Sequence, residues 1–272
     1  MRDSADGAGT ARLNAGRWNG DALLDEEDGV AVEVPVALVY NGVSHAVLLA
    51  TPCDLEDFAY GFTLSEAIAT DAGELLGVEV GDRDALGVTI DVRLTSRAFA
   101  RLSDRRRTLA GATGCGLCGV ESLEQATRAV DPVPSTIHLD PKVVPGSLAQ
   151  LIDAQPMRAE TGSVHVAAWI GPDGNLQLAR EDVGRHNALD KLLGARARGT
   201  SRDGFAVISS RASYEMVLKA ATMRVEMLVA VSAPTSLAVQ TAETVGMTLV
   251  GFARGRQFKV YTRPERFRTG PR

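Results

Sequence analysis

The chain of 272 residues is 45% apolar and 23% charged, which is close to the average for soluble globular proteins, and it can bury one sizeable core or divide into two lobes. Its net charge of -5 argues against a general nucleic-acid binder, so any anion site has to be a local cluster of cations. The polar first nine residues lack the apolar centre of a signal peptide, and the lack of any uncharged apolar run of about eighteen residues excludes a membrane-spanning helix.

The N-terminal part of the chain begins without periodicity and then adopts an extended pattern. Residues 1–20 are rich in Asn, Gly, Asp and Ala, and we predict a flexible tail without secondary structure. In residues 30–49, valines alternate with other residues before Asn41-Gly42, a pair that favours tight turns, and an apolar run follows it. This segment is therefore predicted to form a β-hairpin.

A helix is predicted to pack on this hairpin. Residues 54–57 supply leading carboxylates, which favour a helix N-terminus. The apolar side chains of this segment share one helical face: Leu55, Phe58, Ala59 and Phe62. Gly61 lies inside the helix, where glycine costs up to about 1 kcal/mol relative to alanine, so we expect another backbone to approach it closely. With a strand at residues 88–94, these elements predict a small α+β lobe over residues 21–110.

A basic, glycine-rich segment follows this lobe. Three consecutive arginines at 105–107 precede four glycines that accompany two cysteines, Cys115 and Cys118. Because glycine leaves the backbone unconstrained, we predict a mobile basic loop over residues 101–119. Residues 111–134 are assigned to this cysteine loop and to the connection between the lobes.

The remaining residues, 135–272, alternate between strand and helix patterns. Strands are predicted at residues 164–170, 205–209, 227–231 and 248–252, with helices at about 184–198 and from residues 214 and 235. Pro, Asp, Gly and Asn at 172–175 mark a turn. This alternation predicts a three-layer α/β domain with a largely parallel sheet.

The spacing of Cys115 and Cys118 leaves several kinds of chemistry open. Nearby arginines would favour the nucleophilic thiolate, and the glycines would leave it accessible, as a persulfide carrier requires. A zinc site would need downstream histidines or a second chain as further ligands, and a dithiol oxidoreductase would be expected at a helix start. A purely structural pair is the fourth possibility. Three cysteines indicate a reducing compartment, so we predict the cytoplasm, and Cys53 is interpreted as a small core residue.

Five segments carry further information when they are taken together and in order. They are residues 51–62 (TPCDLEDFAYGF), 114–119 (GCGLCG), 180–191 (REDVGRHNALDK), 232–236 (SAPTS) and 248–255 (TLVGFARG). In this order they resemble the motifs of the formate dehydrogenase accessory protein family, FdhD, which is a family of sulfurtransferases. The resemblance covers nearly the whole chain after residue 20, which makes it far more specific than any single motif.

The resemblance implies a sulfur carrier that receives persulfide sulfur from a cysteine desulfurase and delivers it to the molybdenum or tungsten bis-pterin guanine dinucleotide cofactor of formate dehydrogenase. Cys115 is the expected persulfide carrier, with Cys118 as its partner. The cofactor is expected as a bound substrate that GDP or GMP could mimic, and no intrinsic metal is expected. The alternative is a protein that binds and inserts the cofactor without transferring sulfur.

The resemblance also implies the assembly and the fold. A homodimer is expected, together with contacts to the desulfurase and to the catalytic subunit of formate dehydrogenase, and no nucleic-acid or membrane partner. The C-terminal lobe is expected to be similar to the cytidine deaminase fold. Two positions depart from the family pattern, because Ala67 and Ser210 stand where the family often has glycine.

A guanine dinucleotide carries phosphates, so cations are expected around it. Arg185, His186, Asn187 and Lys191 lie at the predicted start of a helix, where free N–H groups and the helix dipole also attract anions. The alternative is a salt-bridged surface helix whose cations pair with neighbouring carboxylates.

A second cationic segment follows the strand at 248–252. It consists of Phe252, Ala253, Arg254, Gly255, Arg256 and Gln257. Two cations, a small glycine and an aromatic face suit a nucleotide, and the resemblance assigns this segment to the cofactor, although arginines on an edge-strand loop can also be merely solvated. Ser209, Arg211 and Ser213 are further candidates because they follow a predicted strand, and open α/β sheets bind ligands at the carboxyl ends of strands. His165 opens another predicted strand and is also a candidate, although a lone histidine there is more often a hydrogen-bonded core residue.

Overall fold

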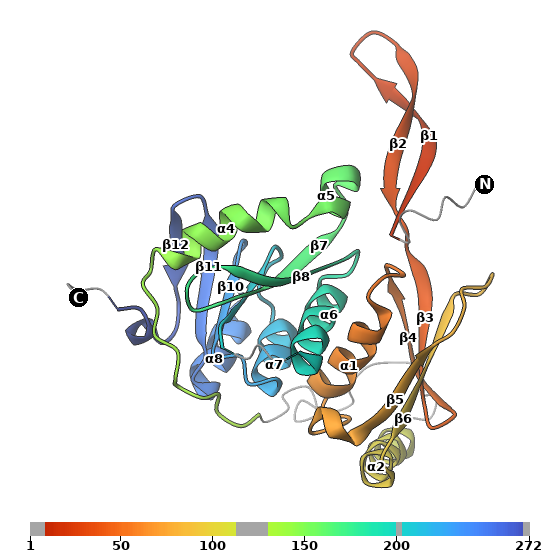
Figure 1. The fold of residues 1–272 in the computed structure, drawn as a ribbon, viewed down its shortest axis with the longest axis vertical. Helices are drawn as coiled ribbons and strands as arrows, with labels where there is room; N and C mark the ends of the chain where they lie inside the picture. The colour runs from red at the N-terminus through yellow and green to blue at the C-terminus, as the bar shows by residue number, and fades with distance from the viewer. Residues whose placement is uncertain (1–8, 113–129, 200–202, 269–272) are drawn as a thin grey trace.

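The structure of the chain, a computed structural model, describes residues 9–112, 130–199 and 203–268. It is a mixed α/β fold whose described strands form a two-stranded ribbon, a four-stranded sheet and a six-stranded sheet (Figure 1). Cys115 and Cys118, and with them most of the predicted cysteine loop, lie outside the described residues.

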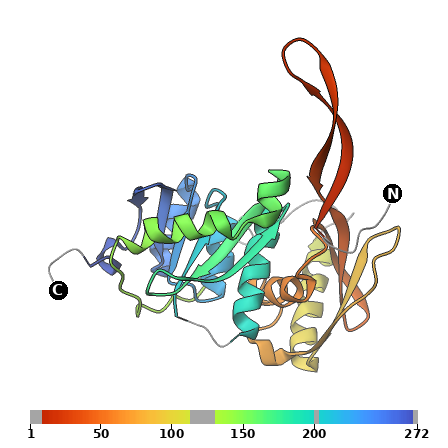
Figure 2. The ribbon, with the colours of Figure 1, turned by 45° about the horizontal axis from the view of Figure 1, so that its top comes forward.

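Residues 10–31 form an antiparallel ribbon, so the flexible tail that we predict for residues 1–20 is wrong from residue 10 onward. Strands β1 (Thr10–Trp18) and β2 (Leu23–Ala31) pair along their whole length and project from the body of the molecule (Figures 1 and 2). The Asn19 side chain accepts hydrogen bonds from the N–H groups of Asp21 and Ala22 at 3.0 and 2.9 Å, which closes the turn. Most of the ribbon is exposed, so its sequence lacks the apolar alternation by which strands are recognised.

The four-stranded sheet contains the predicted hairpin and the predicted strand at 88–94. Its order is β4-β3-β6-β5, with bounds β3 (Val34–Tyr40), β4 (Val43–Ala50), β5 (Leu75–Val80) and β6 (Val88–Leu94). Asn41 and Gly42 both have positive φ, 48° and 81°, as a tight hairpin turn between β3 and β4 requires. The hairpin therefore begins at Val34, and Val30 belongs to β2.

Two helices accompany this sheet, and the second corrects a prediction. Helix α1 (Leu55–Ser65) has the predicted bounds within a few residues, whereas α2 (Ser96–Ala112) occupies much of the segment predicted as a loop from residue 101. Ala98 and Leu102 are buried one helical turn apart and join the core of the four-stranded sheet. Arginine is a good helix former, so the run of cations that suggested a loop is compatible with a helix.

The six-stranded sheet has the order β12-β11-β10-β9-β7-β8. Its strands are β7 (His165–Ile170), β8 (Leu176–Asp182), β9 (Phe205–Ile208), β10 (Met227–Ala230), β11 (Thr248–Arg254) and β12 (Gln257–Val260). Strands β9, β10 and β11 are parallel, but β7 is antiparallel to both neighbours and β12 is antiparallel to β11. The predicted largely parallel sheet is thus wrong, because β7 and β12 run against the other four strands and pair with β8 and β11 as hairpins.

Helices cover both faces of this sheet, as a three-layer arrangement requires. One face packs against α6 (Arg185–Arg198), α7 (Tyr214–Thr222) and α8 (Ser236–Val245), and the other packs against α4 (Val143–Asp153), which is followed by the short α5 (Pro156–Thr161). Helix α4 is not predicted, because Pro145 and Gly146 obscure the spacing of its buried residues Val144 and Leu151. Across the described residues, no helix is both long and apolar enough to cross a membrane.

The two sheets are joined by a direct backbone contact between α1 and α6. A Cβ atom added to Gly61 would lie 1.7 Å from the carbonyl oxygen of Asp190, and one added to Gly194 would lie 1.8 Å from that of Asp57. The close approach predicted for Gly61 is therefore confirmed, and α6 contributes a second glycine that matches it.

The two departures from the family pattern differ in their backbone conformation. Ala67 follows the end of α1 with a φ of 51°, and its N–H and that of Ile68 donate to the carbonyls of Leu64 and Thr63, each at 2.9 Å. This is the helix end that normally takes glycine, and alanine there costs about 1–2 kcal/mol. Ser210 lies outside the left-handed region, so it carries no such strain.

Replacing Gly61 by Ala is expected to lower the free energy of unfolding by about 3 kcal/mol, because the methyl group overlaps the Asp190 carbonyl and forces α1 away from α6. Gly146→Ala is the matched control, because Gly146 lies in α4 with nothing within 4 Å of an added Cβ, and it should stabilise by about 0.5–1 kcal/mol. Urea unfolding followed by circular dichroism measures both. Equal unfolding midpoints for Gly61→Ala and the unmodified protein would contradict the contact.

Candidate functional site

The topology of the six-stranded sheet brings several predicted site residues to one edge. Strands β8 to β11 end there and the antiparallel β7 begins there, so the connections that leave these strands meet along what we call the carboxyl edge. The Ser209 hydroxyl accepts a hydrogen bond from the N–H of Val166 at 3.0 Å, and His165 pairs with Asp182 at the end of β8. His165, Arg185, Ser209 and Arg211 therefore lie on neighbouring connections of one edge.

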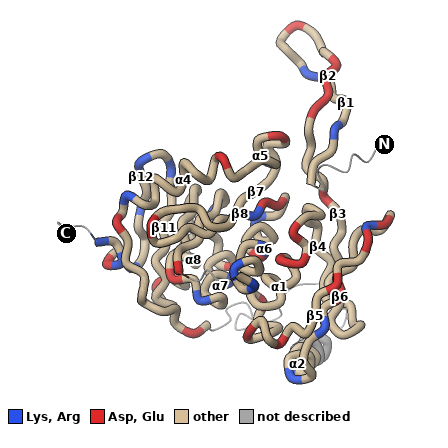
Figure 3. Tube along the Cα trace, in the orientation of Figure 1, with Lys and Arg blue, Asp and Glu red and all other residues tan. Residues whose placement is uncertain are grey.

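The cationic segment 252–257 lies at the same edge, at the end of β11. Phe252 sits in a β-bulge with a φ of 52° and is 39% exposed, and the Lys259 ammonium lies 4.9 Å from the centre of its ring. Strained backbone of this kind concentrates at functional sites. Lys and Arg gather around β12, whereas Asp and Glu line β2 (Figure 3).

The arginines of this segment are exposed, while the residue between Phe252 and Arg254 is not. Ala253 is buried, and Gly255 adopts a φ of 55° in the turn before β12. Arg254, Arg256 and Gln257 are all exposed, and the Arg254 Nε donates to the Val231 carbonyl at 3.2 Å. An aromatic ring and two guanidinium groups are thus presented together, an arrangement that suits a base and its phosphates.

Two histidines near the edge are shifted toward the neutral form. Burial, followed by the charges of Arg185 and Arg158, lowers the pKa of His165. Burial also lowers the pKa of His186, although Glu215, whose carboxylate lies 2.8 Å from the His186 Nε2, opposes this. At neutral pH both imidazoles can therefore accept or donate a hydrogen bond without a full charge.

Lys191 and Asn187 do not lie at an accessible phosphate site. The Lys191 side chain is completely buried, and its ammonium lies 2.7 Å from the Asp182 carboxylate and donates to the Thr51 carbonyl at 2.9 Å. The Asn187 amide donates to the Leu49 carbonyl at 2.8 Å and to Asp182 at 3.1 Å. The structure thus places both residues in contacts between the two lobes. This is closer to the alternative of a salt-bridged helix, although the Lys191–Asp182 pair is buried rather than on the surface.

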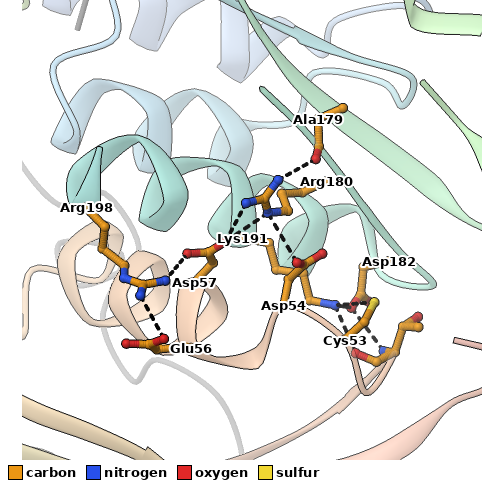
Figure 4. A network of polar contacts seen from close by, with 10 residues as sticks. Cys53, Asp54, Glu56, Asp57, Ala179, Arg180, Asp182, Lys191 and Arg198 are labelled. Carbon is orange, nitrogen blue, oxygen red and sulfur yellow. Dashed lines mark hydrogen bonds and ion pairs between the residues drawn. The ribbon is translucent and has the colours of Figure 1, made fainter. Parts of the chain in front are cut away.

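A second group of charges surrounds Asp57, a buried residue that we do not predict as a site residue (Figure 4). Its carboxylate accepts from the Arg180 Nη2 at 2.7 Å and from the Arg198 Nη1 at 2.5 Å. Arg198 also pairs with the more exposed Glu56 at 2.7 Å. The contacts of Asp57 and the contacts of Lys191 both connect the 51–62 motif to the 180–191 motif or to the rest of α6. Two of the family motifs therefore meet in space.

A third buried pair lines a pocket between the lobes. The Lys219 ammonium lies 2.9 Å from Asp190 and 2.6 Å from Glu66, and it donates to the Ser65 hydroxyl at 3.1 Å. Burial lowers the pKa of Lys219, but the two carboxylates outweigh it and raise the pKa above its usual value. The pocket has a volume of about 350 Å³ and is also lined by Phe62, His186 and Glu215. Only spatial proximity reveals this site, because no local motif contains Lys219.

The described residues hold no group of three or more His, Cys, Asp or Glu side chains that could bind a metal. The zinc alternative remains untested, because the paired cysteines lie outside those residues. Cys53 is partly buried, with its Sγ 3.9 Å from the Lys191 Nζ, and burial raises the pKa of its thiol. A raised pKa disfavours the nucleophilic thiolate, so Cys53 is a poor candidate for sulfur chemistry.

Comparisons with known proteins point in one direction. A sequence profile of the FdhD/NarQ family matches residues 31–268. The chain is 52% identical to the sulfur carrier protein FdhD of Cupriavidus necator over 92% of its own length and 87% of that protein, and 52% identical to that of Variovorax paradoxus over 89% and 88%. The crystal structure of a candidate formate dehydrogenase accessory protein from Desulfotalea psychrophila superposes with a TM-score of 0.75 over 95% of this chain and 99% of that one. At 24% identity, that likeness concerns the fold.

Replacing Asp57 by Asn is expected to lower the free energy of unfolding by about 3 kcal/mol, because two guanidinium groups lose a buried carboxylate partner. Glu56→Gln removes an exposed partner of the same Arg198 and should cost less than about 1 kcal/mol. Chemical denaturation of both variants provides the comparison. The interpretation is wrong if the two substitutions shift the unfolding midpoint equally.

Proposed function

The chain belongs to the FdhD/NarQ family, and on that premise we propose that it is a sulfur carrier that loads persulfide sulfur on Cys115 and delivers it to a molybdenum or tungsten bis-pterin guanine dinucleotide cofactor. The observation that carries this proposal is the match, over nine tenths of the chain, to proteins named sulfur carrier protein FdhD. The carboxyl edge supports it, since its cations and exposed ring are suited to the nucleotide part of such a cofactor.

The proposed loading step is a thiolate exchange. The Cys115 thiolate attacks the terminal sulfur of a persulfide on a cysteine desulfurase, the S–S bond of the donor breaks, and the donor cysteine leaves as a thiolate. Cys115 then carries the sulfur as a persulfide.

Release of this sulfur as sulfide requires two electrons, and Cys118 can supply them. Its thiolate attacks the inner sulfur of the Cys115 persulfide, which forms a Cys115–Cys118 disulfide and expels hydrosulfide toward the metal of the cofactor. The spacing of two intervening residues in the sequence suits such an exchange. In this proposal Cys118 resolves the persulfide, and an external thiol restores the pair.

The cofactor is proposed as a bound substrate held by Phe252, Ala253, Arg254, Gly255, Arg256 and Gln257 together with Arg185, His186, His165, Ser209 and Arg211. Asn187 and Lys191 are proposed to act indirectly, because their buried contacts position the start of α6. The proposed partners are a cysteine desulfurase, the catalytic subunit of formate dehydrogenase and a second copy of the chain. We also propose the cytoplasm as the compartment, where persulfide chemistry is protected, and a cytidine deaminase-like C-terminal lobe.

A second candidate function is cofactor insertion without sulfur transfer. The carboxyl edge favours it as much as it favours sulfur delivery, because its described residues include cations and an aromatic ring but no thiol. In that case a Cys115→Ala, Cys118→Ala double variant would still activate the dehydrogenase.

Incubation with a cysteine desulfurase and L-cysteine is expected to add one or more sulfur atoms, about 32 Da each, to the unmodified protein and none to Cys115→Ala. Cys53→Ala is the matched control and should load normally, because the thiol of Cys53 is partly buried and its pKa is raised. Intact-mass spectrometry measures the additions. Equal loading of Cys115→Ala and the unmodified protein would refute the assignment of the carrier.

A further inference from the structure

Several buried polar atoms near the carboxyl edge have no hydrogen-bond partner among the described residues. Two of them, the Tyr214 hydroxyl and the His186 Nε2 that contacts Glu215, belong to residues that line the pocket between the lobes, and the other three lie on the edge itself. These three are the His165 Nδ1, the Arg185 Nε and the Ser213 Oγ. The three belong to neighbouring parts of the edge, namely the start of β7, the connection from β8 to α6 and the connection from β9 to α7. Buried polar groups are nearly always satisfied, so three such atoms along one edge indicate a missing partner.

Ser213 is the most informative of the three because of its position at the N-terminus of α7. It is 9% exposed and occupies the N-cap, yet its hydroxyl accepts no bond from the first turn of the helix. The N–H groups of Tyr214 and Glu215 also lack an acceptor within the described part of the chain. At the neighbouring helix α8, by contrast, the Thr235 hydroxyl accepts the N–H of Ala238. The N-cap position of α7 therefore carries a hydroxyl that makes no capping hydrogen bond.

The start of α6 lies directly beside that of α7. His186 and Glu215, each the second residue of its helix, are joined by a contact of 2.8 Å between Nε2 and Oε2. Gly184 caps α6 without a side chain, so the first turn of this helix also presents free N–H groups next to the Arg185 guanidinium. Two adjacent helix N-termini with an arginine favour a ligand that carries negative charge.

The charges around this edge also decide where an anion would lie. The pocket between the lobes is lined by Glu66, Asp190 and Glu215, whose carboxylates outnumber the ammonium of Lys219. At the carboxyl edge the carboxylates already have partners, because Asp182 pairs with Lys191, Glu215 pairs with His186, and Glu181 accepts from the N–H groups of Met157 and Arg158. Arg185 and the exposed Arg211 form no ion pair within the described part of the chain. A phosphate is therefore favoured at the edge and disfavoured in the pocket.

We propose that His165, Arg185 and Ser213, with the first-turn N–H groups of α7, form a phosphate subsite in which the Ser213 hydroxyl donates to a phosphate oxygen. A phosphate has enough acceptor oxygens for the three unpartnered atoms, each of which can donate a hydrogen bond provided that the imidazole of His165 carries its proton on Nδ1. This inference rests on the proposed function for the identity of the ligand, a nucleoside diphosphate. It adds that the diphosphate group accepts a hydrogen bond from the Ser213 hydroxyl.

Titration calorimetry of the full chain with GDP and with inorganic pyrophosphate tests this subsite. Ser213→Ala is expected to bind both ligands about tenfold more weakly, since one hydrogen bond to a charged group is lost. Its melting temperature without ligand should be unchanged, because the hydroxyl has no partner in the free protein. The combination of weaker binding and an unchanged melting temperature is not expected of a residue whose role is purely structural.

Thr235→Ala is the matched control. It removes a hydroxyl that already caps a helix, so it should lower the melting temperature and leave both affinities unchanged. The subsite is refuted if Ser213→Ala binds GDP as tightly as the unmodified protein, if Thr235→Ala loses as much affinity, or if the unmodified protein binds neither ligand. Persulfide loading of the unmodified protein is measured separately: loading with no effect of Ser213→Ala refutes the subsite alone, and a Ser213 effect without loading refutes the sulfur carrier alone.

Discussion

The arrangement of the two lobes depends on the contact between α1 and α6, where Gly61 and Gly194 let the two backbones touch. Any larger residue at either position would separate the helices and, with them, the charges that flank the contact. Asp57 reaches Arg180 and Arg198, and the buried ammonium of Lys191 reaches the Thr51 carbonyl, only because the helices are this close. The motifs at 51–62 and 180–191 are thus one packing unit, contributed by two distant parts of the chain.

This unit separates residues that hold the fold together from residues that can meet a ligand. Lys191 and Asn187 bind buried partners and are not available to a ligand. Arg185 and His186, in the same motif, lie at the start of α6 beside the carboxyl edge. The edge then gathers Arg211, Phe252 and Arg254 from the ends of other strands. A rigid inter-lobe contact holds the start of α6 in place, which preorganises one side of the proposed cofactor site.

Much of this could be predicted from the sequence, and the failures have physical reasons. Strands and helices with a buried face, such as α1 and β9, follow their apolar periodicity, and Gly61 could be interpreted from its helical context alone. The ribbon β1–β2 is mostly exposed, so its sequence shows no apolar alternation that would indicate strands. Helix α2 contains a run of arginines, which suggested a loop. The role of Lys191 could not be predicted, since a lysine in a motif looks the same whether it binds a phosphate or the buried Asp182. Lys219 depends wholly on tertiary proximity.

The most direct test of the account follows the sulfur itself. The protein is loaded with isotopically labelled persulfide, separated from the donor and mixed with desulfurated cofactor, which is then analysed by mass spectrometry. The account predicts that labelled sulfur moves to the cofactor while the protein loses the same amount. Cofactor that binds to the protein but stays unlabelled, with the persulfide retained, would contradict it.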